Sequence, residues 1–349
     1  MKTAVSSLPM SALQALVAKA GLERFRADQI FSWIHGRGVT RWDAMTNLAR
    51  PLRERLAEEW MIEDLVLDRQ LDTEDGTSKL VLATGDGHRI ETVLIPEERK
   101  LTQCVSTQVG CRMGCRFCAT AQLGLTRNLT PGEIVAQVRH GVAWAEAHGM
   151  RLSNLVYMGM GEPFDNYDGT LDSVRILLEP LGRHFSTRKI TISTVGHIDG
   201  LSRLSREDLQ VNLAVSLNAT TQQVRETIMP ASKRWPLQAL LETLRRFPLE
   251  KRRRITLEYV LIDGVNDSDE DAERLASIAR SMRSKVNLIR LNPFVGCPFS
   301  PPTVKRTERF EQLVRARNVT VILRRSRGSE IAAGCGQLAL QPGPDRTSH

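Results

Sequence analysis

The strongest constraint on the fold is a repeated strand, loop and helix pattern that begins near residue 101. Helical patterns separate the strand-like segments, and one of them starts with Thr130, Pro131 and Glu133, a capping box with proline in the first helical position. Strands that alternate with helices predict a parallel sheet or barrel of the α/β class. The strand-like segments are QCVSTQ, SNLVYMG, KITIST, QVNLAVSL, RRITLEYVLI, KVNLIRLN and VTVILRR.

The first hundred residues have a different character. Helical periodicity runs through residues 8–60, which predicts a small all-helical module. The next stretch contains SKLVLAT and HRIETVLI with turn residues between them, which predicts a hairpin-like strand extension. We therefore expect a helical accessory domain at 1–62, a β extension at 63–96, a core barrel at 97–340 and a loose tail at 341–349.

Charge favours a polyanionic partner. The 349 residues include 48 Lys and Arg against 40 Asp and Glu, a formal net charge of +8, so nucleic acid is the first candidate. Aromatic residues make up only 5%, so we expect recognition of nucleic-acid shape with one extruded base rather than a long stacking platform. Either phosphate contact or a solvated face explains the basic residues Arg53, Arg55, Lys251, Arg252, Arg253, Arg254, Arg324, Arg325 and Arg327.

The chain shows no sign of a membrane-spanning segment. No stretch approaches the roughly 20 continuous apolar residues that a membrane span needs. The opening residues are interrupted by Ser6, Ser7 and Pro9, and the segment after them has the pattern of a first helix. We expect a cytoplasmic protein with no membrane partner.

Four of the six cysteines fall between Cys104 and Cys118. Such crowding is typical of metal or redox chemistry in a reducing compartment rather than of a disulfide framework. Cys111, Cys115 and Cys118 place three thiolates on one loop, GCRMGCRFCAT, and three suit an iron–sulfur cluster with one open iron. A structural zinc site needs four ligands, and Cys104 would complete it, so a zinc-dependent RNA-binding module is the alternative.

The spacing of these three cysteines, with Phe117 before the last, resembles the signature of the radical S-adenosylmethionine (SAM) superfamily. The resemblance implies a [4Fe-4S] cluster that cleaves SAM to a 5′-deoxyadenosyl radical, within a partial parallel (β/α)6 barrel. Active sites of such barrels lie at the carboxyl ends of the strands. We expect cofactor contacts from Gly161, Glu162, Ser193, Ser216, Leu217, Asn218 and Asn292, with Glu162 accepting hydrogen bonds from the ammonium group of the methionine moiety.

Nearly the whole chain resembles one family within this superfamily. The segments ETVLIP, CVSTQVGC, MGMGEP, ISTVG, LNPF and GCGQL are similar to those of the RlmN RNA methyltransferases. The resemblance implies methylation of adenosine carbon 2 in the peptidyl-transferase region of 23S ribosomal RNA and in transfer RNA just 3′ of the anticodon. It also implies two SAM molecules per turnover, a monomer, and an electron donor such as a flavodoxin system. The related Cfr enzymes, which methylate carbon 8, are the alternative.

The resemblance assigns three further roles. Cys335 would carry the methyl group as S-methylcysteine, Cys104 would resolve the protein–RNA intermediate through a transient disulfide with Cys335, and Glu91 would accept the ring proton. Cys297 matches no family role, so we expect it to pack. Asn218 stands where the family usually has histidine, which limits what its side chain is expected to do.

Overall fold

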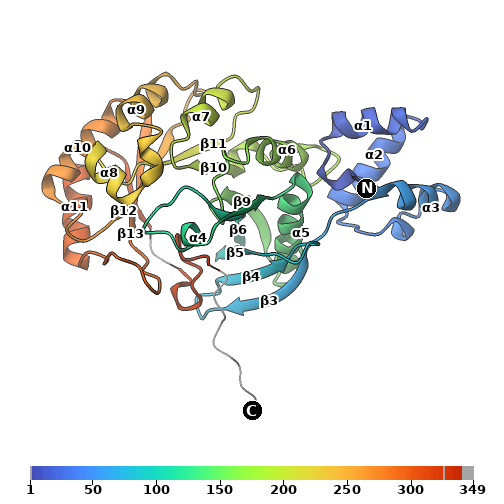
Figure 1. The fold of residues 1–349 in the computed structure, drawn as a ribbon, viewed down its shortest axis with the longest axis horizontal. Coiled ribbons are helices and arrows are strands. Elements are labelled where there is room, and N and C mark those ends of the chain that lie inside the picture. Colours follow the sequence, from blue (N-terminus) through green and yellow to red (C-terminus); the bar gives the residue numbers. More distant parts are fainter. Residues whose placement is uncertain (1, 325–326, 340–349) are drawn as a thin grey trace, which may run out of the picture.

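A sheet of ten strands organises the computed structural model, which describes residues 2–324 and 327–339. The strand order is β14-β13-β12-β11-β10-β9-β6-β5-β4-β3. The expected tail at 341–349 and Arg325 lie outside the described residues. Figure 1 shows the sheet running through the molecule, with the later helices outside one end of it and the N-terminal helices at the other side.

Seven strands of this sheet run parallel to one another, as the alternating pattern predicts. Six strand–helix units followed by β14 confirm the partial parallel barrel, and the sheet does not close among the described residues. The strands are β6 (Lys100–Cys104), β9 (Arg151–Tyr157), β10 (Ile190–Thr194), β11 (Asn212–Ser216), β12 (Ile255–Leu261), β13 (Ser284–Arg290) and β14 (Val321–Arg324). The helices are α4 (Ala119–Gln122), α5 (Pro131–Ala147), α6 (Tyr167–Leu178), α7 (Ile198–Leu204), α8 (Gln222–Ile228), α9 (Leu237–Arg246), α10 (Asp269–Arg280) and α11 (Val304–Ala316).

Three antiparallel strands extend the same sheet. They are β3 (Val66–Asp72), β4 (Ser78–Ala83) and β5 (Arg89–Glu97). β5 pairs antiparallel with β6, which in turn pairs parallel with β9, so the extension is continuous with the barrel strands. Residues of β4 and β5 are therefore held in register with β6, the strand that ends at Cys104.

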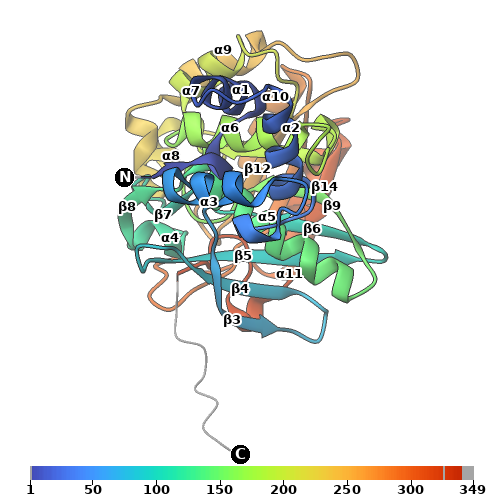
Figure 2. The same ribbon diagram turned by 90° about the vertical axis from the view of Figure 1, so that its right-hand side faces the viewer.

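The N-terminal helices form the expected helical module: α1 (Met10–Lys19), α2 (Phe25–Phe31), a π-helical turn (Ser32–Gly36) and α3 (Arg50–Glu59). The fully buried side chains of Leu13, Ile30 and Phe31 form its core. A short parallel pair joins β1 (Thr3–Ala4) to β2 (Trp60–Met61), so the two ends of the module meet. Figure 1 shows these helices at one side of the molecule, and in Figure 2 they face the viewer. No helix in the described ranges combines the length and apolar character that a membrane crossing requires.

The prediction of one continuous strand, QCVSTQ, is wrong, because residues 105–107 are not part of a strand. β6 ends at Cys104, and β7 (Gln108–Cys111) starts a separate two-stranded ribbon with β8 (Gly124–Asn128). Between β6 and β7 the Gln137 side chain of α5 forms two hydrogen bonds with the backbone of Ser106. It accepts from the Ser106 N–H at 2.8 Å and donates to the Ser106 carbonyl oxygen at 2.9 Å. These bonds replace the sheet ladder, so the chain leaves the sheet and enters the ribbon that frames the cysteine loop.

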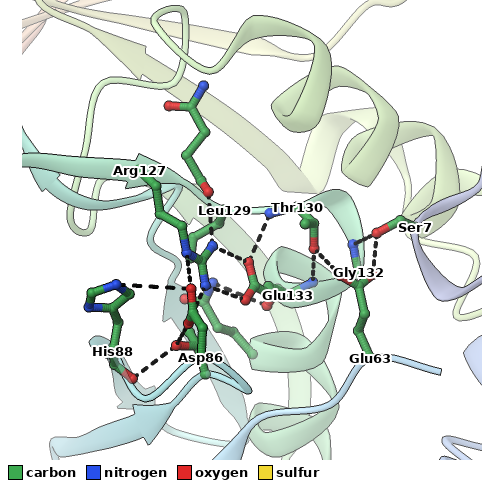
Figure 3. Close-up of polar contacts among 12 residues, drawn as sticks. Ser7, Glu63, Asp86, His88, Arg127, Leu129, Thr130, Gly132 and Glu133 are labelled. Carbon is green, nitrogen blue, oxygen red and sulfur yellow. Dashed lines mark hydrogen bonds and ion pairs between the residues drawn. The ribbon is translucent and has the colours of Figure 1, made fainter. Parts of the chain in front are cut away.

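A polar network fastens this ribbon to its surroundings (Figure 3). Arg127 of β8 donates to Asp86, in the turn between β4 and β5, at 2.7 and 2.8 Å, and to Glu133 of α5 at 2.8 Å. The Thr130–Glu133 capping box is formed as predicted. Thr130 also donates to Glu63 at 2.8 Å, which links the helical module to α5. The network therefore joins four parts of the chain around the entry to the cysteine loop.

Candidate active site at the strand ends

One cavity lies at the carboxyl ends of the parallel strands, and the cysteine loop forms part of its wall. Cys111 and Cys115 are buried and Cys118 is half-buried. The cavity is lined, among others, by Cys111, Cys115, Cys118, Gly161, Glu162, Ser193, Ser216, Asn218, Asn292 and Cys335. Of the expected cofactor contacts, only Leu217 is outside the lining, because its side chain is fully buried in the core.

The three loop thiols suit a cluster of several metal ions. Burial raises the pKa of Cys111 to about 12 and that of Cys115 well above its ordinary value, so thiolates form there only beside compensating cations. In the described part of the chain, no three His, Cys, Asp or Glu side chains are arranged around one metal ion. Cysteines that each bind a different iron of a cubane need no such common centre.

Glu162 is held at the end of β9 by backbone donors. Its carboxylate accepts the N–H of Phe164 at 3.1 Å and the N–H of Val195 at 2.8 Å, and its side chain is almost fully buried. Burial raises the pKa of this carboxyl group to about 7. Gly161 has a φ of 105°, and a Cβ there would lie 2.7 Å from Gln108 Cβ. The sharp turn therefore requires glycine at position 161. It directs the Glu162 carboxylate to the cavity, where a cationic amine would donate hydrogen bonds to it.

Asn218 lines the cavity, but its side chain is used within the protein. Its Oδ1 accepts the N–H of Val260 at 2.9 Å, and its Nδ2 lies 3.3 Å from the sulfur of Met229. The residue adopts a φ of 56°, a left-handed conformation that asparagine tolerates. Its side chain therefore braces the end of β11 against β12, in line with the limited role expected for it.

Cys335 reaches the cavity from the C-terminal segment, and the residue is exposed. Several contacts fix this segment: Ala119 N–H donates to Gly336 O at 2.7 Å, Gln337 Nε2 to Pro293 O at 2.8 Å, and Asn292 Nδ2 to Cys335 O at 3.3 Å. Cys335 thus lies between the cysteine loop and the end of β13. The structure brings it to the cluster cysteines although more than two hundred residues separate them in sequence.

Cys104 approaches this group from β6. Burial, followed by the proximity of Cys335, raises its pKa to about 12, while Arg324 acts in the opposite direction. All six cysteines are free thiols, so the transient disulfide stays a prediction. Cys104 is not in the lining that holds the three loop cysteines, which removes the support for a zinc site that it would complete.

Two charged residues of the interior were not anticipated as site residues. Arg324, for which phosphate contact and a solvated face were both open, is half-buried and lines a hollow with Cys335 and Asn292. Glu258 of β12 lines the main cavity, and burial raises its pKa. A glutamate inside the otherwise apolar segment RRITLEYVLI is the sequence signal that points to it. Glu91, the expected proton acceptor, is fully buried and lies outside both linings.

Comparisons with known proteins agree with this geometry. Residues 105–276 match the model of the radical SAM superfamily, and residues 5–62 match the ribosomal RNA large subunit methyltransferase N-terminal domain. A protein of Anaeromyxobacter dehalogenans named dual-specificity RNA methyltransferase RlmN is 48% identical over 97% of this chain and 92% of its own length. The chain belongs to the RlmN family. This confirms the resemblance inferred from the sequence motifs.

Other relatives and one solved structure extend the match. The RlmN of Geobacter sulfurreducens is 45% identical over 97% of this chain and 94% of its own length. A crystal structure of a radical SAM methyltransferase from Sphaerobacter thermophilus superposes with a TM-score of 0.91 at 47% identity, covering 96% of this chain and 99% of that one. The chain is therefore a radical SAM enzyme that uses a [4Fe-4S] cluster and SAM, and the three loop cysteines fit that cluster.

Proposed function

We propose that this protein methylates carbon 2 of adenosine in 23S ribosomal RNA and in transfer RNA by a radical SAM mechanism. The name of its relatives, dual-specificity RNA methyltransferase, supports RNA as the substrate class. The observation that carries the proposal is the presence of Cys335 in the wall of the cavity that the three loop cysteines also line. A methyl group on the sulfur of Cys335 would lie in the cavity where the radical forms.

The chemistry of the target explains why a stored methyl group is needed. Carbon 2 of adenine is an electron-poor ring carbon, so it does not attack the sulfonium methyl group of SAM as an amine or thiolate does. A radical route removes this obstacle. The SAM-derived radical is what the bound cofactors supply, and the protein has to provide the methyl carrier, the proton acceptor and the exclusion of water.

In this proposal the residues of the cavity divide the work. Cys111, Cys115 and Cys118 bind the cluster, and Glu162 accepts hydrogen bonds from the ammonium group of SAM. Ser193, Ser216, Asn292 and the backbone at Leu217 and Asn218 complete the cofactor site. Buried apolar side chains, among them Met113, Phe117, Met229 and Leu291, keep solvent away from the loop cysteines.

Cys335 and Cys104 carry the covalent steps. The Cys335 thiolate takes a methyl group from one SAM, hydrogen abstraction converts this group to a thiomethylene radical, and the radical adds to carbon 2. The adduct then loses an electron to a one-electron acceptor and a proton to Glu91. Finally the Cys104 thiolate attacks the Cys335 sulfur: the disulfide forms, the carbon–sulfur bond breaks, and its electron pair and a proton complete the methyl group. A thiol reductant reopens the disulfide.

The partners follow from these steps. The cluster needs a one-electron donor, for which we propose a flavodoxin system. We propose that the protein acts as a monomer. The two RNA substrates and the free thiols favour the cytoplasm as the site of action.

The test is anaerobic reconstitution with iron, sulfide and SAM, followed by nucleoside mass spectrometry of 23S ribosomal RNA and transfer RNA from cells that lack the enzyme. We expect 2-methyladenosine in both RNAs. Formation of 8-methyladenosine would instead identify the Cfr reaction, and a colourless protein that retains stoichiometric zinc would refute the proposal.

A further inference from the structure

Lys79 and Glu91 form a buried ion pair in the extension of the sheet. Lys79 Nζ lies 3.0 Å from Glu91 Oε1, and the two side chains are 2% and 0% exposed. They come from the adjacent antiparallel strands β4 and β5. Burial of two opposite charges costs several kcal/mol per ion before their attraction is counted, so apolar residues of similar size often serve stability as well or better. The pair therefore calls for an explanation other than packing.

The strand register places this pair on the face that carries Cys104. Lys79 is directly opposite Val93, and Val93 is directly opposite Cys104. Residues that face each other across neighbouring strands share one face of the sheet, and so do alternate residues of one strand. Glu91 is two positions before Val93 and therefore lies on that face. Ile95, two positions after Val93, lines the hollow that contains Cys335.

A second contact of Lys79 connects the pair to the methyl carrier. Lys79 Nζ donates to the backbone oxygen of Ala332 at 3.4 Å. Ala332 lies three residues before Cys335 and adopts a φ of 50°, in the left-handed region that alanine rarely occupies. One ammonium group thus touches both the carboxylate of Glu91 and the segment that bears Cys335.

The carboxylate has acceptor capacity that the protein does not use. Neither carboxylate oxygen of Glu91 has a hydrogen-bond partner among the described residues, and the carboxylate forms an ionic contact with Lys79. Buried carboxylates that serve only structure normally have their lone pairs filled. A fixed carboxylate with unused lone pairs, on the sheet face that it shares with Cys104, has the chemistry of a proton acceptor.

We propose that Lys79 is a positioning residue: its ammonium group holds the Glu91 carboxylate for removing the carbon-2 proton of the adenine joined to Cys335. This inference rests on the proposed function. In the step, the carbon–hydrogen bond breaks, its electron pair stays in the ring and the proton goes to a Glu91 oxygen. The unpaired electron of the adduct would pass to an iron–sulfur cluster, the class of one-electron acceptor that the enzyme already uses. Without the ammonium group, the carboxylate loses the contact that fixes its position.

The test compares Lys79→Met, which keeps the chain length and removes the charge, with Lys79→Arg, which keeps the charge. Glu91→Gln serves as the reference. Arg89→Met is the matched control. Arg89 lies in β5, as Glu91 does, and the substitution removes the cation of a solvent-exposed ion pair with Asp68. Each reconstituted holoenzyme is assayed for methyl occupancy of Cys335, for 5′-deoxyadenosine, and for RNA covalently bound to protein, with carbon-2-deuterated adenosine in the RNA.

We expect Lys79→Met to methylate Cys335 and to form 5′-deoxyadenosine as the wild type does, but to lose about 100-fold or more in turnover. It should accumulate covalent RNA that retains the deuterium, as Glu91→Gln should, while Lys79→Arg restores release and Arg89→Met behaves as wild type. Wild-type turnover in Lys79→Met overturns the inference. So does loss of Cys335 methylation in both Lys79 variants, which would mean that Lys79 only holds the C-terminal segment. Failure of the wild type itself to yield 2-methyladenosine would instead refute the proposed function.

Discussion

The side-chain amide of Asn292 donates a hydrogen bond to the backbone oxygen of Cys335 over 3.3 Å. Asn292 follows the end of β13 and also lines the main cavity, so the residue expected to contact SAM is in addition a support of the segment that contains Cys335. The contact lies on the backbone of Cys335 and leaves its sulfur free. Any change at this asparagine therefore acts on two functions that separate measurements can distinguish.

Asn292→Ala should lower both SAM affinity and the rate of Cys335 methylation, with little loss of stability, since one hydrogen bond contributes about 1 kcal/mol. Equilibrium binding of SAM and mass spectrometry of the Cys335 peptide measure the two effects. Gln337→Ala provides the control, because it removes the neighbouring tie to Pro293 O without changing the cavity lining. It should slow methylation and leave SAM affinity unchanged; equal losses of affinity in both variants would contradict this division.

Substitutions of Cys335 and Cys104 should block the proposed reaction at different steps. Cys335→Ala removes the methyl carrier, so product formation should vanish while SAM cleavage persists. Cys104→Ala should methylate Cys335 and then accumulate covalently attached RNA, because the sulfur attack that releases the base is missing. Denaturing gel electrophoresis of labelled RNA detects the adduct. Cys297→Ala, which changes a half-buried cysteine with no assigned role, should retain activity within about twofold.

Arg127 should be important for stability as well as for the cysteine loop. Its guanidinium group bridges Asp86 and Glu133 and is only about a quarter exposed, with a relative exposure of 27%. Arg127→Met leaves both carboxylates without their cation, so we expect a loss of about 1–3 kcal/mol in the free energy of unfolding, measured by urea titration. Arg317→Met, at a more exposed pair with Glu273, should lose less than about 1 kcal/mol. Equal losses would show that the bridge adds nothing beyond a surface pair.

Acid should weaken the helical module through His35. Burial, followed by the charge of Arg139, lowers the pKa of His35 to about 3, and neither ring nitrogen has a hydrogen-bond partner among the described residues. The unfolded chain takes up this proton near pH 6.5, so below that pH it binds more protons than the folded chain. Stability should therefore fall by up to about 1.4 kcal/mol per pH unit from this group as pH drops from 6.5 towards 3.

The corresponding measurement is urea unfolding at pH 7.5 and 5.5. His35→Leu should reduce the difference in stability between the two pH values by about 1 kcal/mol. The exposed His148 provides the control, since His148→Leu should leave the difference as in the wild type. An unchanged difference in His35→Leu would show that this histidine does not control the acid response.

Periodicity and turn residues were sufficient to predict the barrel strands, the helical module and the capping box, because these depend on local pattern. The β7–β8 ribbon escaped prediction, since a side chain from α5, distant in sequence, ends β6 at Cys104. The three loop cysteines could be recognised from their spacing. The half-buried position of Arg324 could not be predicted, because its tandem with Arg325 has the appearance of a surface cluster. The proximity of Lys79 to Glu91 could not be predicted either, because it depends on the strand register, which sequence alone does not supply.

The C-terminal segment has a consequence for how RNA gains access. It contacts β4 through Lys79, β5 through Arg327 and α4 through Thr120. These bonds hold the backbone on both sides of the exposed Cys335. In the proposed reaction the protein therefore fixes the position of the methyl group, and the RNA has to extend its base to that position.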